Sequence, residues 1–360
     1  MKILVVSTVP FANDGITNVI INNYQHIDYA QIKMNFVFPN KPNDSFYNDA
    51  MNRKSKVFVI PNRTNEILKY MKELNRLLKK ENYDVVHVHG NSSTMILELF
   101  LAKINGVFKR VAHTHAKYTK YPILNKMLNP IFKSTFTTAL APSVEAGDFL
   151  FGRGKYQVLE NGIAVEDYEF TNEKRKNIRA EFCLNDNEFV IGNIGRLAEE
   201  KNQKYLIELL KKMNNIRYKL LIIGSGPLEL PLKKIVKEYG LEKQVVFTGV
   251  RYDIGDLLSA LDALIIPSLS EGFGITAIEG QAAELPVFIS ENIPKDVIQT
   301  PLVSVFMLNE MNELINKINN LSPDITSREK NKNNSNIKKS PYNAVNSAEK
   351  LKRIYLNERN

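Results

Sequence analysis

The chain alternates between short apolar runs and longer segments in which apolar and polar residues are mixed. The apolar residues follow one another without interruption in eleven short runs rich in Val and Ile. Uninterrupted runs of this kind are typical of strands that are buried on both faces, in a parallel sheet covered by helices. The predicted strands cover residues 2–7, 34–38, 56–60, 84–89, 110–115, 137–142, 189–195, 219–224, 244–249, 263–268 and 286–290.

Segments with helical spacing lie between these runs. Residues 65–82 place Ile67, Met71, Leu74 and Leu78 on one stripe, as a helix packed on a sheet requires. Residues 202–213 repeat this arrangement in the second half. Alternating strands and helices predict an α/β fold, and a length of 360 residues predicts two domains. We therefore expect two doubly wound, Rossmann-like halves.

One polar segment interrupts the alternation. Residues 164–188 are charged and contain no strand-like run, so we interpret them as the connection between the halves. Ligands of open parallel sheets bind outside the carboxyl ends of the strands, so two such domains facing each other would form a cleft lined by strand ends. The predicted parts are a domain at 1–165, a second domain at 166–340 with an exposed loop at 327–340, and a final helix within 341–360 that packs back on the first domain.

The composition predicts a globular cytoplasmic protein. It is 44% hydrophobic and 24% charged, and Cys183 is the single cysteine, which permits no internal disulfide and fits a reducing compartment. No run approaches the roughly 18 apolar residues of a membrane span. The apolar N-terminal stretch passes into Asn-Asp-Gly without a cleavage site, so we interpret it as a buried strand rather than a signal peptide.

The formal net charge of +9 calls for a partner or a solvated surface. Residues 109–133 hold six Lys or Arg and no acid. This segment is interpreted either as a solvated face or as a contact with an anionic membrane surface or a phosphate-bearing acceptor. Nucleic acid is not expected as a partner, because zinc-finger spacing, aromatic RNA-binding signatures and basic leucine-zipper patterns do not occur in the sequence.

Candidate chemistry follows the strands of the second half. The sequence GRLAEEKN puts Arg196 and Lys201 between a strand and a helix, where two cations and a helix N-terminus suit a diphosphate. The alternative is a surface pair of Arg196 with Glu199 or Glu200. The later GSGP lacks the third glycine of a dinucleotide site, and neither a P-loop nor an Asp-x-Asp occurs. We therefore expect no cofactor and no metal, with the two cations stabilising a phosphate leaving group.

The stretch SEGFGITAIEGQAAE places two carboxylates on either side of a glycine-rich loop. Gly272 and Gly274 allow main-chain N–H groups to approach an anion closely. Glu279 could accept two hydroxyls of a ribose, and Glu271 would lie where a sugar sits. The structural alternative is a capping box between Thr276 and Glu279 at a helix start.

The order and spacing of GRLAEEKN, GSGP, VVFTG and PSLSEGFGITAIE resemble the retaining glycosyltransferases of the GT-B fold numbered family four, in particular bacterial enzymes that build capsular or exopolysaccharides. The resemblance covers nearly the whole chain. STVPFANDGITNVI, which contains Gly15, is similar to the family's N-terminal glycine loop near the donor diphosphate. YDVVHVHG and RVAHTHAKY match strands whose histidines face the acceptor, and LENGI matches the residues before the hinge.

This resemblance implies roles for individual residues. His115 would lie beside the transferred sugar, with His113 as a rival on the same strand face, while His87 and His89 would contact the acceptor. The implied catalytic residues are His115, Glu271, Arg196 and Lys201. The implied donor-binding residues are Gly15, Arg196, Lys201, Gly224, Val250, Gly272, Phe273, Gly274, Ile275 and Glu279.

The implied activity is metal-independent transfer of a sugar, with retention of configuration, from a nucleotide diphosphate. The carrier would be UDP by family habit, and the acceptor a hydroxyl of a glycan or lipid-linked glycan in capsule or exopolysaccharide synthesis at the inner face of the cell membrane. Ala116, Ala164 and the single Gly15 depart from the common family pattern and bear mainly on the acceptor. Two alternatives stay open, a nucleotide-sugar epimerase of the same twin-domain fold and an inactive partner subunit of a polysaccharide assembly.

Overall fold

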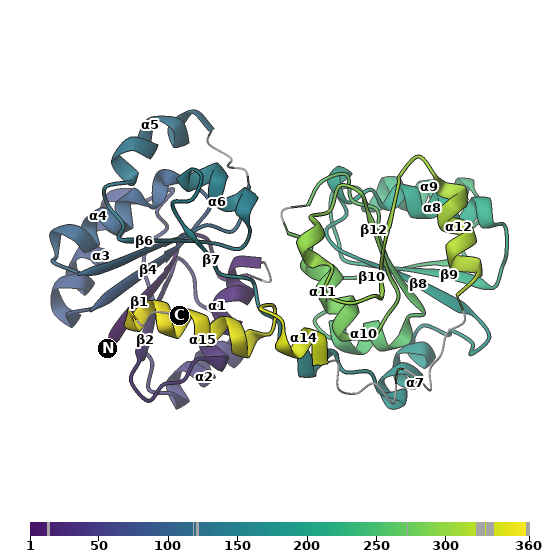
Figure 1. The fold of residues 1–360 in the computed structure, drawn as a ribbon, viewed down its shortest axis with the longest axis horizontal. Helices are drawn as coiled ribbons and strands as arrows, with labels where there is room; N and C mark the ends of the chain where they lie inside the picture. The colour runs from purple at the N-terminus through teal and green to yellow at the C-terminus, as the bar shows by residue number, and fades with distance from the viewer. Residues whose placement is uncertain are drawn as a thin grey trace. The chain divides into compact units, whose positions relative to one another are not determined.

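The computed structural model describes residues 1–12, 15–117, 119, 122–271, 273–321, 328 and 335–357. The chain forms two compact units, each built on its own parallel sheet (Figure 1). The N-terminal unit comprises Met1–Gly162 and Ala344–Asn360, and the C-terminal unit comprises Ile163–Asn343. The boundaries expected at 165 and 340 each lie three residues from these divisions.

The N-terminal unit contains a seven-stranded sheet in the order β3-β2-β1-β4-β5-β6-β7. Every pairing in this order is parallel, so the strands end at one common edge. The strands are β1 Lys2–Ser7, β2 Lys33–Phe38, β3 Val57–Val59, β4 Val85–His89, β5 Lys109–His113, β6 Thr138–Ala141 and β7 Gln157–Val158. The helices are α1 Gly15–His26, α2 Asp44–Asn52, α3 Ile67–Glu81, α4 Ile96–Ile104, α5 Pro122–Phe132, α6 Val144–Phe151 and α15 Ala344–Leu356, with a 3₁₀ turn η1 at Ser93–Met95.

Helices cover both faces of this sheet, which explains why its strands are uninterrupted apolar runs. One core places Leu74 of α3 and Leu99 of α4 against Val86 and Val88. The opposite core places α1, α2 and α15 against alternate residues of the same strands. The stripe predicted on α3 is partly wrong, because Ile67 is 44% exposed and the buried residues of this helix are Tyr70, Leu74, Leu77 and Leu78.

The C-terminal unit contains a six-stranded parallel sheet in the order β10-β9-β8-β11-β12-β13. The strands are β8 Phe189–Ile194, β9 Tyr218–Ile223, β10 Val245–Gly249, β11 Ala263–Ile266, β12 Val287–Ser290 and β13 Val303–Phe306. The helices are α7 Asn172–Glu181, α8 Gln203–Met213, α9 Glu229–Glu238, α10 Ile254–Ala260, α11 Ile275–Ala282, α12 Met311–Asn319 and α14 Ser335–Lys339, with 3₁₀ turns η2 Val165–Tyr168, η3 Glu199–Lys201 and η4 Lys295–Val297. Apolar residues of α8, α9 and α12 cover one face, and those of α10, α11 and α14 cover the other.

The final helix α15 belongs to the N-terminal unit, where it lies against α1 (Figure 1). The hydroxyl of its Tyr355 lies 2.5 Å from Nδ1 of His87 on β4. The Lys109 ammonium donates to the Tyr355 carbonyl at 3.2 Å and to Oδ1 of Asn357 at 2.5 Å. Arg110 donates to the carbonyls of Thr135 and Val107, each at 2.6 Å. Two of the six cations of segment 109–133 therefore hold the fold together instead of facing a partner.

The segment interpreted as a connection is not a bare linker, since residues 172–181 form helix α7 and pack on α10. Arg175 and Arg179 of α7 are buried and pair with Asp262 at 2.7 and 3.4 Å. Arg175 also donates to the carbonyls of Ala260 and Leu261 at the C-terminal end of α10, where the helix dipole is negative. The sequence analysis missed this helix because its buried side chains are mainly guanidinium groups rather than aliphatic groups.

The prediction of an exposed loop at 327–340 is also wrong for the residues of this segment that the structure describes. Arg328 is buried and donates to the carbonyls of Leu261 and Ala283, both at 2.9 Å. Residues 335–339 form α14, and the remaining positions of this segment below 335 lie outside the described residues. Strands β7 and β13 were not predicted. They are edge strands of two and four residues, and Phe306 is their one buried side chain. Among the described residues, no helix combines the length and apolar character that crossing a bilayer demands.

We predict that Asp262→Asn strongly destabilises the C-terminal unit. The carboxylate is the acceptor for two buried guanidinium groups and for the Val190 N–H at 2.7 Å. Removing one partner of a buried ion pair costs about 3–5 kcal/mol of unfolding free energy. Urea unfolding followed by circular dichroism measures this loss. The matched control is Asp256→Asn, whose side chain is 44% exposed and pairs with Lys174, and which should cost less than about 1 kcal/mol. Equal losses in the two variants would contradict the assigned role of Asp262.

Candidate functional site

The C-terminal unit has its topological switch point between β8 and β11. These strands are neighbours in the sheet although β9 and β10 separate them in the sequence. Crevices beside such reversals of strand order are where open α/β sheets bind ligands. The loop after β8 carries Arg196 and Lys201, and the loop after β11 carries Glu271. The fold therefore gathers the predicted residues at the position where a ligand site is expected.

Lys201 and Glu271 meet directly at this switch point. The Lys201 ammonium donates to Oε1 of Glu271 at 2.5 Å, and the Ser268 hydroxyl donates to the same oxygen at 2.8 Å. The two charged side chains are 24% and 11% exposed. The loops are also joined by main-chain contacts, since the Leu269 N–H donates to the Glu200 carbonyl at 2.8 Å. A cation and a carboxylate are thus held together in a fixed position.

Close backbone packing explains the glycines at this edge. A methyl group on Gly224, where φ is +135°, would lie 2.1 Å from the Gly195 carbonyl oxygen. A methyl group on Gly226 would lie 2.3 Å from the Leu197 carbonyl oxygen. Glycine therefore lets the loops after β8 and β9 hydrogen bond, as in Leu197 N–H to the Ser225 carbonyl at 2.9 Å. In the structure the predicted ligand residue Gly224 serves this packing.

Arg196 is the exposed cation of the site. Its carbonyl accepts a hydrogen bond from Gln203 at 3.1 Å, which fixes the backbone, while its guanidinium has no ion-pair or hydrogen-bond partner among the described residues. The surface pair with Glu199 or Glu200 that the sequence left open is not formed. A cation without a protein partner at a switch point is suited to an anionic ligand.

Glu279 does not form the capping box. The residue before α11 is Gly274, in the left-handed region with φ of 93°, and no side chain caps the helix. The capping interpretation is therefore wrong, because Thr276 already lies inside the helix. Instead, the Tyr168 hydroxyl of η2 donates to Oε1 of Glu279 at 3.0 Å. Burial raises the pKa of Glu279, and the hydrogen bond from Tyr168 opposes this rise.

The other residues predicted to bind the donor differ in burial and packing. The Phe273 ring is buried, with its centroid 5.1 Å from that of the Tyr342 ring in a tilted arrangement, so its side chain belongs to the core, and Ile275 packs on the same core. Val250 is 52% exposed after β10. Gly272 lies outside the described residues.

Gly15 lies in the N-terminal unit, where it begins helix α1. A methyl group there would meet no heavy atom within 4 Å. Among the described residues, packing therefore does not require a glycine at this position.

Four histidines form a stack at the carboxyl edge of β4 and β5 in the N-terminal unit. His87 Nε2 lies 3.2 Å from His113 Nδ1, and His89 Nδ1 lies 2.9 Å from His115 Nε2. His87, His89 and His113 are buried, whereas His115 follows the strand end and is partly exposed. Of the two rivals for the sugar, His115 is the one that reaches the surface.

Burial keeps these imidazoles neutral. It lowers the pKa of His115 to about 3 and holds the pKa of His87, His89 and His113 well below the usual range, with the neighbouring rings adding to the effect. The side-chain nitrogens of His87, His89 and His113 lie within 4.8 Å of one another, the one such grouping found in the described part of the chain. Because Nδ1 of His87 and Nδ1 of His89 already have partners, this arrangement is a hydrogen-bonded stack, and the expected absence of a bound metal stays a prediction.

Three residues of these sites escaped the sequence analysis. Tyr168 holds Glu279, Ser268 holds Glu271, and the Asn91 side-chain oxygen accepts the His115 N–H at 3.0 Å. Ser268 is the last residue of the predicted strand 263–268 and Asn91 comes two residues after the predicted strand 84–89, so their place at the carboxyl edge was a usable signal. Tyr168 comes from the segment interpreted as a connection and had no such signal.

Comparison with known proteins identifies the class to which this fold and site belong. The family model "Glycosyl transferases group 1" matches residues 174–338, and "Glycosyl transferase 4-like" matches residues 39–141. The chain is 25% identical to the putative glycosyltransferase EpsF of Bacillus subtilis, covering 79% of this chain and 77% of EpsF. It is 27% identical to the UDP-Gal:alpha-D-GlcNAc-diphosphoundecaprenol alpha-1,3-galactosyltransferase of Escherichia coli, covering 99% of this chain and 97% of that enzyme.

A solved structure shares the fold. The crystal structure of Anabaena Alr3699/HepE in complex with UDP matches with a TM-score of 0.77 at 18% identity, over 99% of this chain and 100% of that one. The architecture is thus the GT-B fold of two parallel α/β units. The chain belongs to the group 1 glycosyl transferases of family four, and it is a glycosyltransferase enzyme. The epimerase and the inactive subunit are therefore set aside.

The histidine stack predicts loss of stability in mild acid. Each imidazole is neutral in the folded chain but takes up a proton below about pH 6.5 in the unfolded chain. The unfolded state then binds more protons, so stability is fully present above pH 6.5 and falls as the pH drops toward 3, by about 1.4 kcal/mol per pH unit for each buried histidine.

Urea unfolding at pH 7, 6 and 5 tests this slope. His113→Asn should reduce the slope of unfolding free energy against pH by about the contribution of one histidine, whatever the change in absolute stability. The control His26→Gln alters the half-buried histidine of α1, outside the stack, and should leave the slope as in the wild type. Identical slopes for His113→Asn and the wild type would show that the stack is not the acid-sensitive element.

Proposed function

We propose that this glycosyltransferase moves a sugar from a UDP-sugar to a hydroxyl of a glycan or lipid-linked glycan, with retention of anomeric configuration, in capsule or exopolysaccharide synthesis. The observation that carries the donor part is the convergence of Arg196, Lys201 and Glu271 at the β8/β11 switch point. UDP as the carrier is supported by the E. coli relative and by the UDP bound to the Anabaena protein, as their names state. The role in polysaccharide synthesis is supported by the names of O-antigen biosynthesis relatives.

The donor diphosphate would bind at Arg196 and Lys201. Of the two cations only Lys201 is paired with a carboxylate, Glu271, so the guanidinium of Arg196 remains available to an anion among the described residues. As the bond between sugar and phosphate breaks, negative charge grows on the diphosphate, and fixed cations stabilise it without reorganising. We infer that neither metal nor cofactor takes part, because the cations occupy the role that a divalent ion otherwise fills and the sequence lacks an Asp-x-Asp.

Glu271 and His115 would act on the sugar. Glu271 can counter the positive charge that develops on the sugar ring once Lys201 turns to the phosphate. His115, with a pKa lowered to about 3, is neutral and would not repel this charge. Gly15 and the main chain at Phe273, Gly274 and Ile275 are further candidates for contact with the diphosphate. Val250 and Gly224 would line the nucleotide.

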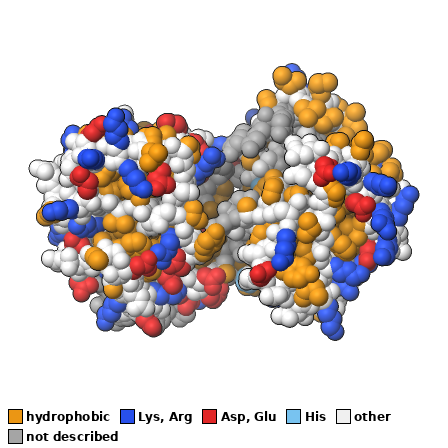
Figure 2. All heavy atoms as spheres, turned by 180° about the vertical axis from the view of Figure 1, so that it is seen from behind, with side chains coloured by type: hydrophobic (Ala, Val, Ile, Leu, Met, Phe, Trp, Pro, Cys, Tyr) orange, Lys and Arg blue, Asp and Glu red, His pale blue; other side chains and the backbone are white. Residues whose placement is uncertain are grey.

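An anionic membrane surface is the proposed location of this reaction. Helix α5 exposes Ile123, Met127 and Ile131 at 77%, 70% and 59%. Lys126 and Lys133 lie on and just after the same helix and are exposed. Figure 2 shows hydrophobic side chains gathered at the end of the N-terminal unit that α5 forms. Apolar side chains mixed with lysines are typical of helices that lie on anionic lipid surfaces.

Lys201→Ala should weaken UDP binding by roughly 10- to 100-fold, which corresponds to about 1.5–3 kcal/mol for a charged hydrogen bond. It should also lower turnover by about 10²–10³, because the cation acts on the leaving group. Isothermal titration calorimetry with UDP and a product assay by mass spectrometry measure both effects. Lys204→Ala is the control, since this side chain is 59% exposed and pairs only with Glu208 on the surface of α8. Wild-type affinity and turnover in Lys201→Ala would remove the proposed diphosphate site.

Glu279 is predicted to accept hydrogen bonds from the ribose hydroxyls of the nucleotide. The wild type should bind UDP about 10- to 100-fold more tightly than 2′,3′-dideoxy-UDP, because a carboxylate accepts both hydroxyls. Glu279→Ala should lose this discrimination. Tyr168→Phe, which removes only the hydrogen bond to Glu279, should keep it. If Glu279→Ala still discriminates as the wild type does while its melting temperature falls, Glu279 is only a packing residue.

A further inference from the structure

The N-terminal unit contains a cavity of about 650 Å³ that the donor site does not use. This volume lies in the range of about 300–1,000 Å³ found for small-molecule sites. The cavity lies at the unit's own switch point, because β1 and β4 are neighbours in the sheet and residues following both strands line it. A pocket at a switch point is placed for a ligand rather than left by imperfect packing.

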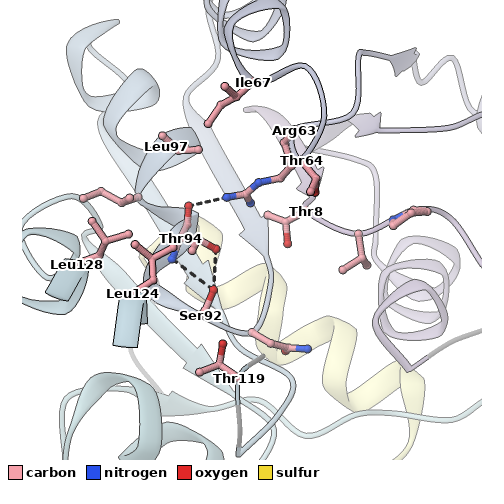
Figure 3. Close-up of a pocket in the computed structure, with 14 residues that line it drawn as sticks. Thr8, Arg63, Thr64, Ile67, Ser92, Thr94, Leu97, Thr119, Leu124 and Leu128 are labelled. Carbon is pink, nitrogen blue, oxygen red and sulfur yellow. Dashed lines mark hydrogen bonds between the residues drawn. The ribbon is translucent and has the colours of Figure 1, made fainter. Parts of the chain in front are cut away.

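One side of this cavity is polar. Thr8, Asn91, Ser92 and Thr94 present hydroxyl and amide groups to it. Ser92 and Thr94 are hydrogen bonded to each other at 2.6 Å, and Arg63 donates to the Thr94 carbonyl at 2.8 Å (Figure 3).

Arg63 does not make this side cationic. Its guanidinium pairs with the fully buried Glu98 at 3.0 Å, and the Tyr70 hydroxyl donates to the same carboxylate oxygen at 2.7 Å. The charge of Arg63 is therefore balanced inside the protein. Neutral hydroxyl and amide groups suit the hydroxyls of a sugar better than a phosphate.

The polar side is connected to the predicted sugar contact. Asn91 lines the cavity, and its side-chain oxygen accepts the main-chain N–H of His115. A sugar hydroxyl at Asn91 therefore lies next to the histidine that the proposed function places beside the transferred sugar.

The other side of the cavity is aliphatic. Ile67, Leu97, Leu124 and Leu128 line it from α3, α4 and α5, and Figure 3 shows the three leucines opposite Thr8, Arg63 and Thr64. Leu124 and Leu128 are four residues apart and so lie on one side of α5. This helix buries only Asn125 and Phe132, and Asn125 anchors it by accepting the Ser93 N–H at 2.7 Å.

The aliphatic side of the cavity also reaches the protein surface. Leu124 is 43% exposed, and Ile67 is 44% exposed. Ile123, Met127 and Ile131 form a second, adjacent apolar stripe on α5 that does not line the cavity. A continuous apolar path therefore runs from the cavity wall to the surface of this helix.

We propose that this cavity holds an amphiphilic acceptor, with its sugar at Asn91, Ser92 and Thr94 and a long aliphatic chain on Ile67, Leu97, Leu124 and Leu128, leaving along α5. This proposal rests on the proposed function for the existence of an acceptor, and it selects the lipid-linked class over free glycans. A pocket that is lined by hydroxyl and amide groups and also by aliphatic side chains matches a ligand that has both a polar and an apolar part. A free oligosaccharide lacks the apolar part, and a simple lipid lacks the sugar.

The test compares the binding of methyl glucoside and octyl glucoside, below the micelle concentration, by calorimetry. Seven added methylenes, half buried, should tighten binding on the order of 100-fold in the wild type. Leu124→Asp and, independently, Leu128→Asp should abolish this gain. Phe100→Asp is the matched control, because Phe100 is 48% exposed on α4 and does not line the cavity. A branched isoprenyl glucoside beside the octyl compound tells an isoprenoid chain from an acyl chain, and a chain-length gain with either supports the proposal.

UDP binding is measured on the same variants and separates the two proposals. Normal UDP binding with equal affinity for methyl and octyl glucoside, or with no binding of either, overturns the lipid pocket and leaves the donor site standing. A gain that survives in both Leu124→Asp and Leu128→Asp, or that is lost equally in Phe100→Asp, also overturns the pocket. If the wild type does not bind UDP, the proposed function is overturned instead.

Discussion

The parallel pairing of β8 with β11 is the constraint on which the donor site depends. Ala263 pairs with Ile191 and Leu264 pairs with Gly192, so both strands end at the same edge of the sheet. A methyl group on Gly192 would lie 2.1 Å from a side-chain carbon of Leu261, which shows how closely the chain entering β11 packs on β8. Because of this pairing, Lys201 and Glu271 form an ion pair although they are 70 residues apart. The main-chain hydrogen bond from the Leu269 N–H to the Glu200 carbonyl also holds the two loops together.

The Lys201–Glu271 pair also sets the electrostatics of donor binding. A diphosphate must compete with Glu271 for the Lys201 ammonium, whereas Arg196 has no protein partner to give up within the described chain. In the proposed function, Arg196 would attract the diphosphate first, and Lys201 would exchange its partner as the anion binds. The exchange would free Glu271 next to the sugar, where its charge would oppose the positive charge that develops during bond cleavage. A single ion pair would thus connect stabilisation of the leaving group with stabilisation of the sugar.

The sequence predicted most of the strands and the charged residues that follow them, and this has a physical reason. Strands buried on both faces must be continuously apolar, so all eleven predicted runs contain a strand, while the short edge strands β7 and β13 lack this requirement and were missed. Helix α7 was missed because guanidinium groups instead of aliphatic side chains fill its buried side. At the site, the positions of Arg196, Lys201 and Glu271 followed from strand ends, but their partners did not. The bond from Tyr168 to Glu279 and the support of His115 by Asn91 join residues whose proximity depends on tertiary packing, which local spacing does not encode.

The two switch points are built alike but differ in charge, and this difference assigns them different parts of the reaction. In the C-terminal unit, two cations and a carboxylate lie at the strand ends. In the N-terminal unit, the corresponding edge carries neutral imidazoles, hydroxyls, an amide and an ion pair whose acid is fully buried. In the proposed function, a charged imidazole there would repel the positive charge that develops on the sugar as well as its own neighbours in the stack, so burial that keeps His115 neutral would favour transfer. The hydroxyl and amide groups of this edge can hydrogen bond sugar hydroxyls. The proposed function therefore gives the phosphate to the C-terminal unit and leaves the partly aliphatic edge of the N-terminal unit for the acceptor.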